Sequence, residues 1–371
     1  MANNFDSNFT RKLAKVFLDK FESERVLSKN VNTQLLSGKF GSDTGDTVDF
    51  KRPTDYTSKR TSGGDISGGD RSSIITGKAS GTVQDYFTVD VDFDEADEAL
   101  KMDQLDSLLA PMATRIKTDL ELDFGEFCMK NTSLLAGSVG TAVTTWDHVA
   151  RAGAIMQASG VPMDSELCYF ANPFTQTKLA SNQRSLGGET GAMSANQKAT
   201  ISDNFAGMRV MTASTLPSYT TGAGADRAGT LSGTPTATYL AAKDTMTMSI
   251  AVTAFQANLV VAAGETITVT GRNRLNLSTR KPIVDETGAQ ILFSGTVTAA
   301  VTLNGSGAGT LVITGPGVYE AAGAFNTVDS ALTSGDVVTL GGAASTLIQP
   351  NLFWHKQAFG IGSVPIKKLY S

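Results

Sequence analysis

The chain has 371 residues and a formal net charge of −5. That length allows two or three domains, and the charge shows none of the basic excess typical of a nucleic-acid-binding surface. Two cysteines are too few for a disulfide framework and favour a reducing compartment. The first residues contain no basic segment followed by an apolar run, and no stretch reaches the roughly 18 apolar residues of a membrane span. We therefore expect a protein made in a cytoplasm, without a secretory signal or a membrane contact.

An amphipathic helix is expected near the N-terminus, where Phe9, Leu13, Phe17 and Phe21 are spaced by four. This spacing places the four side chains along one side of a helix. Such an apolar side needs a surface to cover it. The surface is either the core of the same subunit or a neighbouring subunit on which the segment lies as an arm, and the spacing fits both.

Residues 37–85 have the pattern of a long two-stranded hairpin, with strands near 44–53 and 74–83 on either side of a Gly-rich polar tip. The segment holds seven basic and seven acidic residues. A hairpin without a core is marginal in water, so we expect it to lie on another surface with complementary charges setting its register; a mobile surface loop is the alternative. The hypothesis for inter-subunit contacts names these charged residues: Lys51, Arg52, Arg60, Asp65, Asp70 and Arg71.

The next segment, 86–93, alternates apolar and acidic side chains and predicts a strand with one acidic face. The acidic run at 90–95 lacks the glycine and the distal glutamate of a calcium loop, so no metal is expected there.

The strongest helix signal starts at Pro111, a residue suited to the first helical position. Met112, Ile116, Leu120 and Phe124 then repeat at four and predict a long helix that crosses the subunit. Opposite charges at i and i+4 support it. The pairs are Arg115–Asp119, Lys117–Glu121 and Glu126–Lys130.

Residues 140–215 predict alternating helices and strands, which makes this part mixed α+β. A helix around 149–156 ends at Gly160, and a short strand covers 167–170. Asn172 and Pro173 have the residue types that cap and open a further helix. Residues 182–206 are polar and Gly-rich and are expected to form a flexible loop, and a strand follows at 208–211.

A change in composition marks the following part of the chain. Residues 1–131 hold 40 of the 67 charged residues, whereas residues 216–348 hold 14 and are rich in Thr, Gly, Ala and Val. This shift indicates a domain boundary. Short apolar runs such as Met246–Val252 and Thr310–Ile313 alternate there with turns, including a glycine-rich turn at 305–309. We predict a small all-β barrel or sandwich.

No motif in the chain indicates catalysis. His148 and His355 are the only histidines, and no zinc-binding spacing, nucleophile elbow, phosphate loop or dinucleotide fingerprint occurs. Cys128 and Cys168 lie in apolar patterns and are expected to be small buried side chains rather than nucleophiles. We therefore expect no enzyme activity, no metal and no cofactor.

The order of the parts resembles the major capsid proteins of tailed bacteriophages with the Hong Kong 97-like fold. It is most similar to the coat proteins of short-tailed enterobacterial podoviruses, which carry an inserted β-barrel. The local strings that carry the resemblance are Thr44-Gly45-Asp46, Phe50-Lys51-Arg52-Pro53, Gly64-Asp65-Ile66-Ser67-Gly68, Leu109-Ala110-Pro111, Thr118-Asp119-Leu120-Glu121, Pro350-Asn351-Leu352-Phe353 and Gly362-Ser363. They span almost the whole chain, and the insert matches mainly in position and in its β character.

This resemblance implies an α+β Hong Kong 97-like capsid fold with an inserted all-β barrel. The implied parts are an N-terminal arm at 1–36, an extended hairpin loop at 37–85, a peripheral domain with its spine helix at 86–139, an axial domain at 140–215, the inserted β-barrel at 216–348, and a C-terminal strand at 349–371 that returns to the peripheral domain.

The implied function is that of a major capsid protein in the virion. Its copies would assemble in the host bacterial cytoplasm as pentamers and hexamers into an icosahedral shell. Scaffolding and portal proteins would be its partners, and the shell would enclose DNA without sequence-specific binding. A phage tail, decoration or adhesin protein built on the β-rich insert is the alternative, which the helical first third of the chain disfavours. A Ser/Thr hydrolase is weaker still, because two lone histidines make a poor base for a nucleophile.

Overall fold

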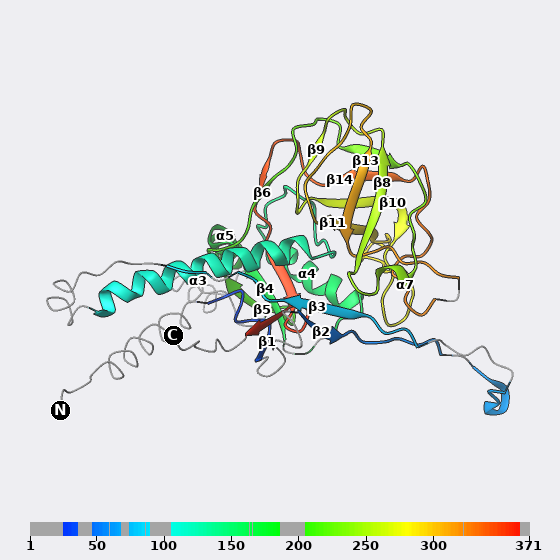
Figure 1. Ribbon diagram of the computed structural model, residues 1–371, viewed down its shortest axis with the longest axis horizontal. Helices are drawn as coiled ribbons and strands as arrows, with labels where there is room; N and C mark the ends of the chain where they lie inside the picture. The colour runs from blue at the N-terminus through cyan, green and yellow to red at the C-terminus, as the bar shows by residue number, and fades with distance from the viewer. Residues whose placement is uncertain are drawn as a thin grey trace, which may run out of the picture.

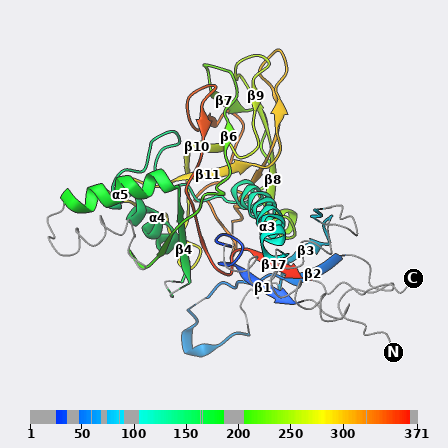
Figure 2. The ribbon, with the colours of Figure 1, turned by 90° about the vertical axis from the view of Figure 1, so that its left-hand side faces the viewer.

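The computed structural model shows a body built on a long helix and small sheets, a projecting hairpin, and a β-barrel (Figures 1 and 2). The structure describes residues 25–35, 47–58, 60–67, 74–85, 87–89, 105–162, 164, 166–185, 205–321 and 323–363. The predicted N-terminal helix, the acidic run at 90–95, Asp70 and Arg71 lie outside these residues. Phe87–Val89, the described part of the strand predicted at 86–93, is not in a strand.

Helix α3 (Leu105–Lys130) runs along the length of the body (Figure 1). It begins six residues before the expected start, so Pro111 lies inside the helix and not at its first position. A proline at this position removes the bond that its N–H would donate to the Ser107 carbonyl, and its ring crowds that carbonyl; the helix nevertheless continues through it for 26 residues in all. The long helix that the sequence predicts is present, and its start was predicted wrongly.

A three-stranded sheet forms the centre of the body. Strand β4 (Leu167–Ala171) is buried along its whole length, between antiparallel β16 (Leu352–His355) and parallel β5 (Arg209–Thr212). Alternate side chains of β4 enter different cores, as strand geometry requires. Phe170 packs in the cluster that includes Phe124 of α3, whereas its neighbour Tyr169 packs in the cluster of the two helices described next.

Helices α4 (Trp146–Ala158) and α5 (Pro173–Ser185) cover the face of this sheet opposite to α3. Helix α4 stops just before Gly160, whose φ of +93° suits a glycine after a helix end. The predicted cap of α5 is present, because the Phe174 N–H donates to the Asn172 side chain at 2.8 Å. Helix α5 continues to residue 185, so the first residues of the loop predicted at 182–206 are helical.

The C-terminal segment forms two strands, where one was expected. Strand β16 joins the central sheet beside β4, a strand in the segment assigned to the axial domain. Strand β17 (Gly360–Ser363) pairs in parallel with β1 (Asn32–Leu35). Aromatic contacts tie the turn between the two strands to α3, with the Phe359 ring 6.4 Å from Phe124 and 6.2 Å from Phe127.

The β-rich segment folds into a closed six-stranded barrel in the order β10-β11-β13-β8-β7-β14. Its strands are β7 (Ala228–Leu231), β8 (Thr247–Thr253), β10 (Thr266–Asn273), β11 (Leu292–Val297), β13 (Gly309–Thr314) and β14 (Val337–Leu340). Inward residues such as Ile250, Ile267 and Leu311 are fully buried in one core, and alternation along β8 follows the period of two. The predicted barrel is therefore present.

Short elements join the barrel to itself and to the body. Beside the barrel lie α7 (Tyr239–Ala242) and the paired strands β9 (Val260–Val261) and β12 (Val301–Thr302). Strand β6 (Tyr219–Thr220) in the chain entering the barrel pairs with β15 (Leu347–Ile348) in the chain leaving it.

The hairpin consists of β2 (Thr47–Lys51) and β3 (Lys78–Thr82), paired antiparallel, and it runs away from the body to a tip with the single turn η1 (Ser62–Gly64) (Figure 1). Among its described residues only Val48 and Gly77 are buried. No described helix is both long and apolar enough to cross a membrane.

Candidate functional site: the hairpin and the barrel junction

The charged hairpin residues that the sequence singles out do not gather in one place. Lys51, Arg60 and Asp65 are exposed at separate points along the hairpin. The Arg52 Nε donates to the Lys78 carbonyl at 3.1 Å, so part of this guanidinium already forms a hydrogen bond within the hairpin. The carboxylate of Asp65 accepts the Ser67 N–H at 2.8 Å, and hydrogen bonds from Ser67 lower the pKa of Asp65. Arg52 and Asp65 therefore already have partners within the chain.

A charge pair across the two hairpin strands escaped the sequence reasoning. The Lys78 ammonium lies 2.8 Å from the Asp49 carboxylate, and the Ser80 hydroxyl donates to the same group. Hydrogen bonds from Lys78 and then from Ser80 lower the pKa of Asp49, and the same contact raises the pKa of Lys78. Asp49 lies opposite Ser80 in the register, so this cluster marks one face of the ladder.

A buried ion pair joins the two chain segments that connect the barrel to the body, the linker that enters the barrel and the linker that leaves it. The Glu265 carboxylate is fully buried, pairs with Arg227 and accepts the Gly222 N–H at 2.9 Å. Arg227 also donates to the carbonyl of Gly222 at 3.2 Å and to that of Gly341 at 3.4 Å. Gly222 lies in the entering linker and Gly341 in the leaving one. One pair of charges therefore ties both linkers to the turn before β10.

The loop after β10 contacts the body through polar groups. Arg274 donates to the carbonyl of Ser133, just beyond α3, at 2.8 Å and to that of Ser294 at 2.7 Å. Burial lowers the pKa of Arg274 to about 10. Nearby, the side chain of Asn276 donates to the Ala158 carbonyl at the end of α4 at 2.7 Å. The bond from Asn276 satisfies a carbonyl that the end of α4 leaves without a helical partner. The bonds to Ser133 and Ala158 seat the barrel on the body.

A second buried carboxylate, Glu121 of α3, holds the segment before β1. The sequence predicts a pair between Glu121 and Lys117 on α3, and the structure shows that the Glu121 carboxylate is buried. It accepts the Leu27 N–H at 2.7 Å and the Ser28 N–H at 3.0 Å, and it also binds the Ser28 hydroxyl. The Trp354 indole donates to the Asn30 carbonyl at 3.0 Å in the same segment. Residues 26–30 are thus anchored to the body on two sides.

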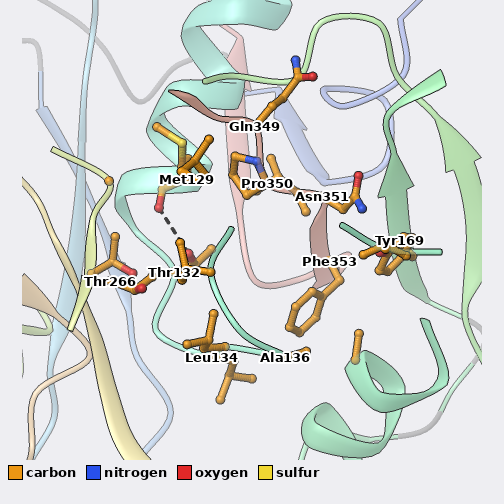
Figure 3. A pocket seen from close by; sticks show the side chains of 18 of the residues that line it. Met129, Thr132, Leu134, Ala136, Tyr169, Thr266, Gln349, Pro350, Asn351 and Phe353 are labelled. Carbon is orange, nitrogen blue, oxygen red and sulfur yellow. Dashed lines mark hydrogen bonds between the residues drawn. The ribbon is translucent and has the colours of Figure 1, made fainter. Parts of the chain in front are cut away.

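A cavity of about 650 Å³ lies where α3, the central sheet and the barrel meet (Figure 3). Met129 and Leu134 line it from the end of α3 and the chain that follows, Tyr169 and Phe353 line it from β4 and β16, and Thr266 lines it from the barrel. None of the residues labelled in Figure 3 is charged. Half of the labelled side chains are polar, and both histidines, His148 and His355, also line the cavity, so its lining is mixed.

The structure brings together one group of side chains that the sequence reasoning kept apart. The ligand-type atoms of Asp164, Glu166 and His355 lie within 4.8 Å of one another. His355 Nε2 is 2.9 Å from the Asp164 carboxylate, and the Gln357 N–H donates to its Nδ1 at 3.2 Å. Both ring nitrogens therefore have partners within the chain, and the hydrogen bond with His355 lowers the pKa of Asp164. Asp164 and His355 are 191 positions apart in the sequence, and motif spacing in a sequence cannot detect a contact between residues so far apart.

Both cysteines are free and buried, as the sequence predicts. Burial raises the pKa of each thiol. A neutral buried thiol is a poor nucleophile, so neither side chain is placed for covalent catalysis.

Comparisons with known proteins agree on one family. The sequence profile of the family described as P22 coat protein, gene protein 5, matches residues 1–370. A major capsid protein of Acyrthosiphon pisum secondary endosymbiont phage 1 is 35% identical over 375 residues, which cover 100% of this chain and 88% of that protein.

Two solved structures are also similar. A chain of Mycobacterium phage Che8 has 14% sequence identity and a TM-score of 0.38, with 77% of this chain and 90% of that chain covered. A chain from the asymmetric unit of the bacteriophage PhiM1 mature capsid has 12% identity and a TM-score of 0.39, with 78% and 86% covered.

Proposed function

Because the chain belongs to the P22 coat protein family and is a phage capsid shell protein, we propose that its copies assemble as pentamers and hexamers into an icosahedral shell around the phage genome. The family match over residues 1–370 carries the proposal. The tail, decoration and adhesin alternative is not favoured, because a coat protein family and a full-length major capsid relative match the chain.

The proposed subunit has the Hong Kong 97-like fold with the domain bounds given above. The barrel strands, which span 228–340, support an insert at 216–348. Helix α3 serves as the spine of the peripheral domain, and α4, α5 and β5 belong to the axial domain. Strand β16 complicates this division, because it pairs with β4 and so joins the C-terminal segment to the axial part.

The hairpin is the proposed contact between neighbouring subunits. It projects from the body with almost no buried surface of its own (Figure 1), and a two-stranded hairpin is marginal unless it packs on something. Its charges attract and align a complementary surface more than they add affinity. Many such weak contacts let misplaced subunits dissociate, and multivalency holds the closed shell together.

The remaining partners follow from the same proposal. Scaffolding and portal proteins guide assembly, which takes place in the host bacterial cytoplasm. The shell encloses DNA without sequence-specific binding, and the net charge of −5 supports this. We assign the chain no catalytic step.

A structure of the shell by cryo-electron microscopy tests the proposal directly. We expect rings of five and six subunits and each hairpin lying across a neighbouring subunit. A helical tube, or closed rings in which the hairpin contacts only its own chain, contradicts it.

Charge reversal in the hairpin tests the contact residues. Lys51→Glu and Arg60→Glu are preferred to a change at Arg52, because replacing Arg52 also removes its hydrogen bond to the Lys78 carbonyl within the hairpin. Each reversal should lower the yield of shells in sedimentation while the monomer stays folded by circular dichroism. Lys281→Glu, an exposed reversal on the barrel, is the matched control, and normal shell yields from both hairpin variants overturn the assignment.

A further inference from the structure

The hairpin lies against the barrel of its own chain at the tip-side end of the β2–β3 ladder. Gly77 is buried although it belongs to the exposed hairpin, and a Cβ placed on it would lie 2.3 Å from the backbone carbonyl oxygen of Lys243. The next residue, Lys78, donates its N–H to the Asp244 carboxylate at 3.1 Å. Lys243 and Asp244 directly follow α7, on the side of the barrel under which the hairpin passes (Figure 1).

The other arm of the hairpin has its own contact with the barrel. The Asp55 carboxylate forms an ion pair with Arg280, in the loop after β10. Arg280 is held in place by the barrel, because its guanidinium also donates to the Asn326 carbonyl at 2.8 Å. Its φ of +55° is left-handed, an unusual conformation for arginine. Strain of this kind persists only where the surrounding structure imposes it, and it gathers at functional positions.

The two arms are also joined to each other at this level. The Arg52 N–H donates to the Gly77 carbonyl at 2.8 Å, and the Arg52 Nε donates to the Lys78 carbonyl at 3.1 Å. This part of the hairpin therefore moves as one unit. A unit attached at a single point can rotate about it, whereas attachment through both arms fixes its direction.

We propose that the barrel is an intramolecular bracket that sets the direction in which the hairpin of the same chain leaves the body. The contacts of Asp55 with Arg280, of Lys78 with Asp244 and of Gly77 with Lys243 form this bracket. Two paired strands of five residues with one buried side chain between them do not hold a direction unaided.

The bracket couples the barrel to contacts between subunits. A neighbour that binds the hairpin in this direction also favours the seated barrel, by linkage. The bracket itself lies within one chain, so its test needs no shell, and its failure is distinguishable from a failure of the proposed assembly.

Hydrogen exchange on the millisecond to second scale, measured on the full-length unassembled chain, tests the bracket. Arg280→Asp and Asp55→Arg each place like charges together and break the ion pair. Exchange in peptides that cover β2 and β3 should rise about three- to tenfold, while peptides from β8 and β13 stay unchanged. Gly77→Ala should act in the same direction because its Cβ meets the Lys243 carbonyl.

Two further variants make the result decisive. The double swap, Asp55→Arg with Arg280→Asp, restores the opposite charges and should bring hairpin exchange back to within about twofold of the parent. Glu286→Gln, which changes a barrel carboxylate 3.7 Å from Arg151 of α4, is the control and should leave the hairpin unchanged. Unchanged hairpin exchange in Asp55→Arg and Gly77→Ala overturns the bracket, and so does a double swap that fails to recover while the barrel stays protected.

Discussion

Replacing Glu121 by alanine should release the N-terminal segment from α3 at a large cost. The carboxylate satisfies the N–H groups of Leu27 and Ser28, which are both fully buried, and a weaker bond comes from Val26 at 3.3 Å. A buried donor left without a partner costs about 1–3 kcal/mol, so two of them cost about 2–6 kcal/mol. We expect Glu121→Ala to lower the free energy of unfolding by about 4 kcal/mol. Glu121→Gln keeps one carbonyl oxygen and should lose about half of that.

Urea unfolding followed by tryptophan fluorescence measures this loss. Trp354 is a suitable reporter, because its indole bonds the Asn30 carbonyl beside the released segment, and Trp146→Phe removes the other tryptophan of the chain. Glu126→Ala is the matched control on the same helix. Its carboxylate forms an exposed pair with Lys130, worth less than about 1 kcal/mol. A loss below about 1 kcal/mol in Glu121→Ala refutes the anchoring role.

Three further predictions concern the barrel, the thiols and the hairpin. Arg227→Met leaves the Glu265 carboxylate buried without its cation and should destabilise the barrel by about 3–5 kcal/mol, whereas the double change to methionine recovers most of this loss in thermal unfolding. Because burial raises the pKa of Cys128 and of the second thiol, neither should react with a thiol reagent at pH 8 until urea unfolds the chain. Lys78→Met should raise the pKa of Asp49 toward its ordinary value of 3.8, as measured by carboxyl carbon NMR, since the Lys78 hydrogen bond is the main cause of its depression.

The pH dependence of the Asp49 contact has a defined sign. The pKa of Asp49 is lower in the folded chain than its ordinary value. The contact therefore stabilises the hairpin at any pH above that ordinary pKa, and this stabilisation disappears as the pH falls through the lowered pKa. Loss of ladder protection should therefore set in below about pH 4. A hairpin that loosens at neutral pH contradicts this origin.

The local sequence pattern predicted the helices and strands whose own residues favour that structure. The runs of β-branched residues in β8, β10 and β13 predicted strands, and the apolar spacing of α3 predicted a long helix. Strand β7 was missed because Ala228–Leu231 contains alanine and glycine, residues with weak strand preference. It is a strand because it pairs with β8 and β14 and closes the barrel, and Gly229 fits where any Cβ would meet the Phe255 ring. Tertiary pairing overrode local preference there.

The candidate site was less predictable because its contacts join distant parts of the chain. Glu121 binds residues 93 to 95 positions away, and Asp55 binds Arg280 across 225 positions. A charged residue in a helix or hairpin pattern is expected at the surface, and no local signal distinguishes one that is buried by a distant segment. The assignment of Arg52 to a contact with a neighbouring subunit stays a prediction, although its Nε already donates to the Lys78 carbonyl of the paired strand.

Negative-stain electron microscopy of the purified full-length chain, with and without the proposed scaffolding protein, tests the central claim most directly. The account predicts closed polyhedral shells of uniform size when the scaffolding protein is present. Monomers or small oligomers under every condition, with no shells, contradict it.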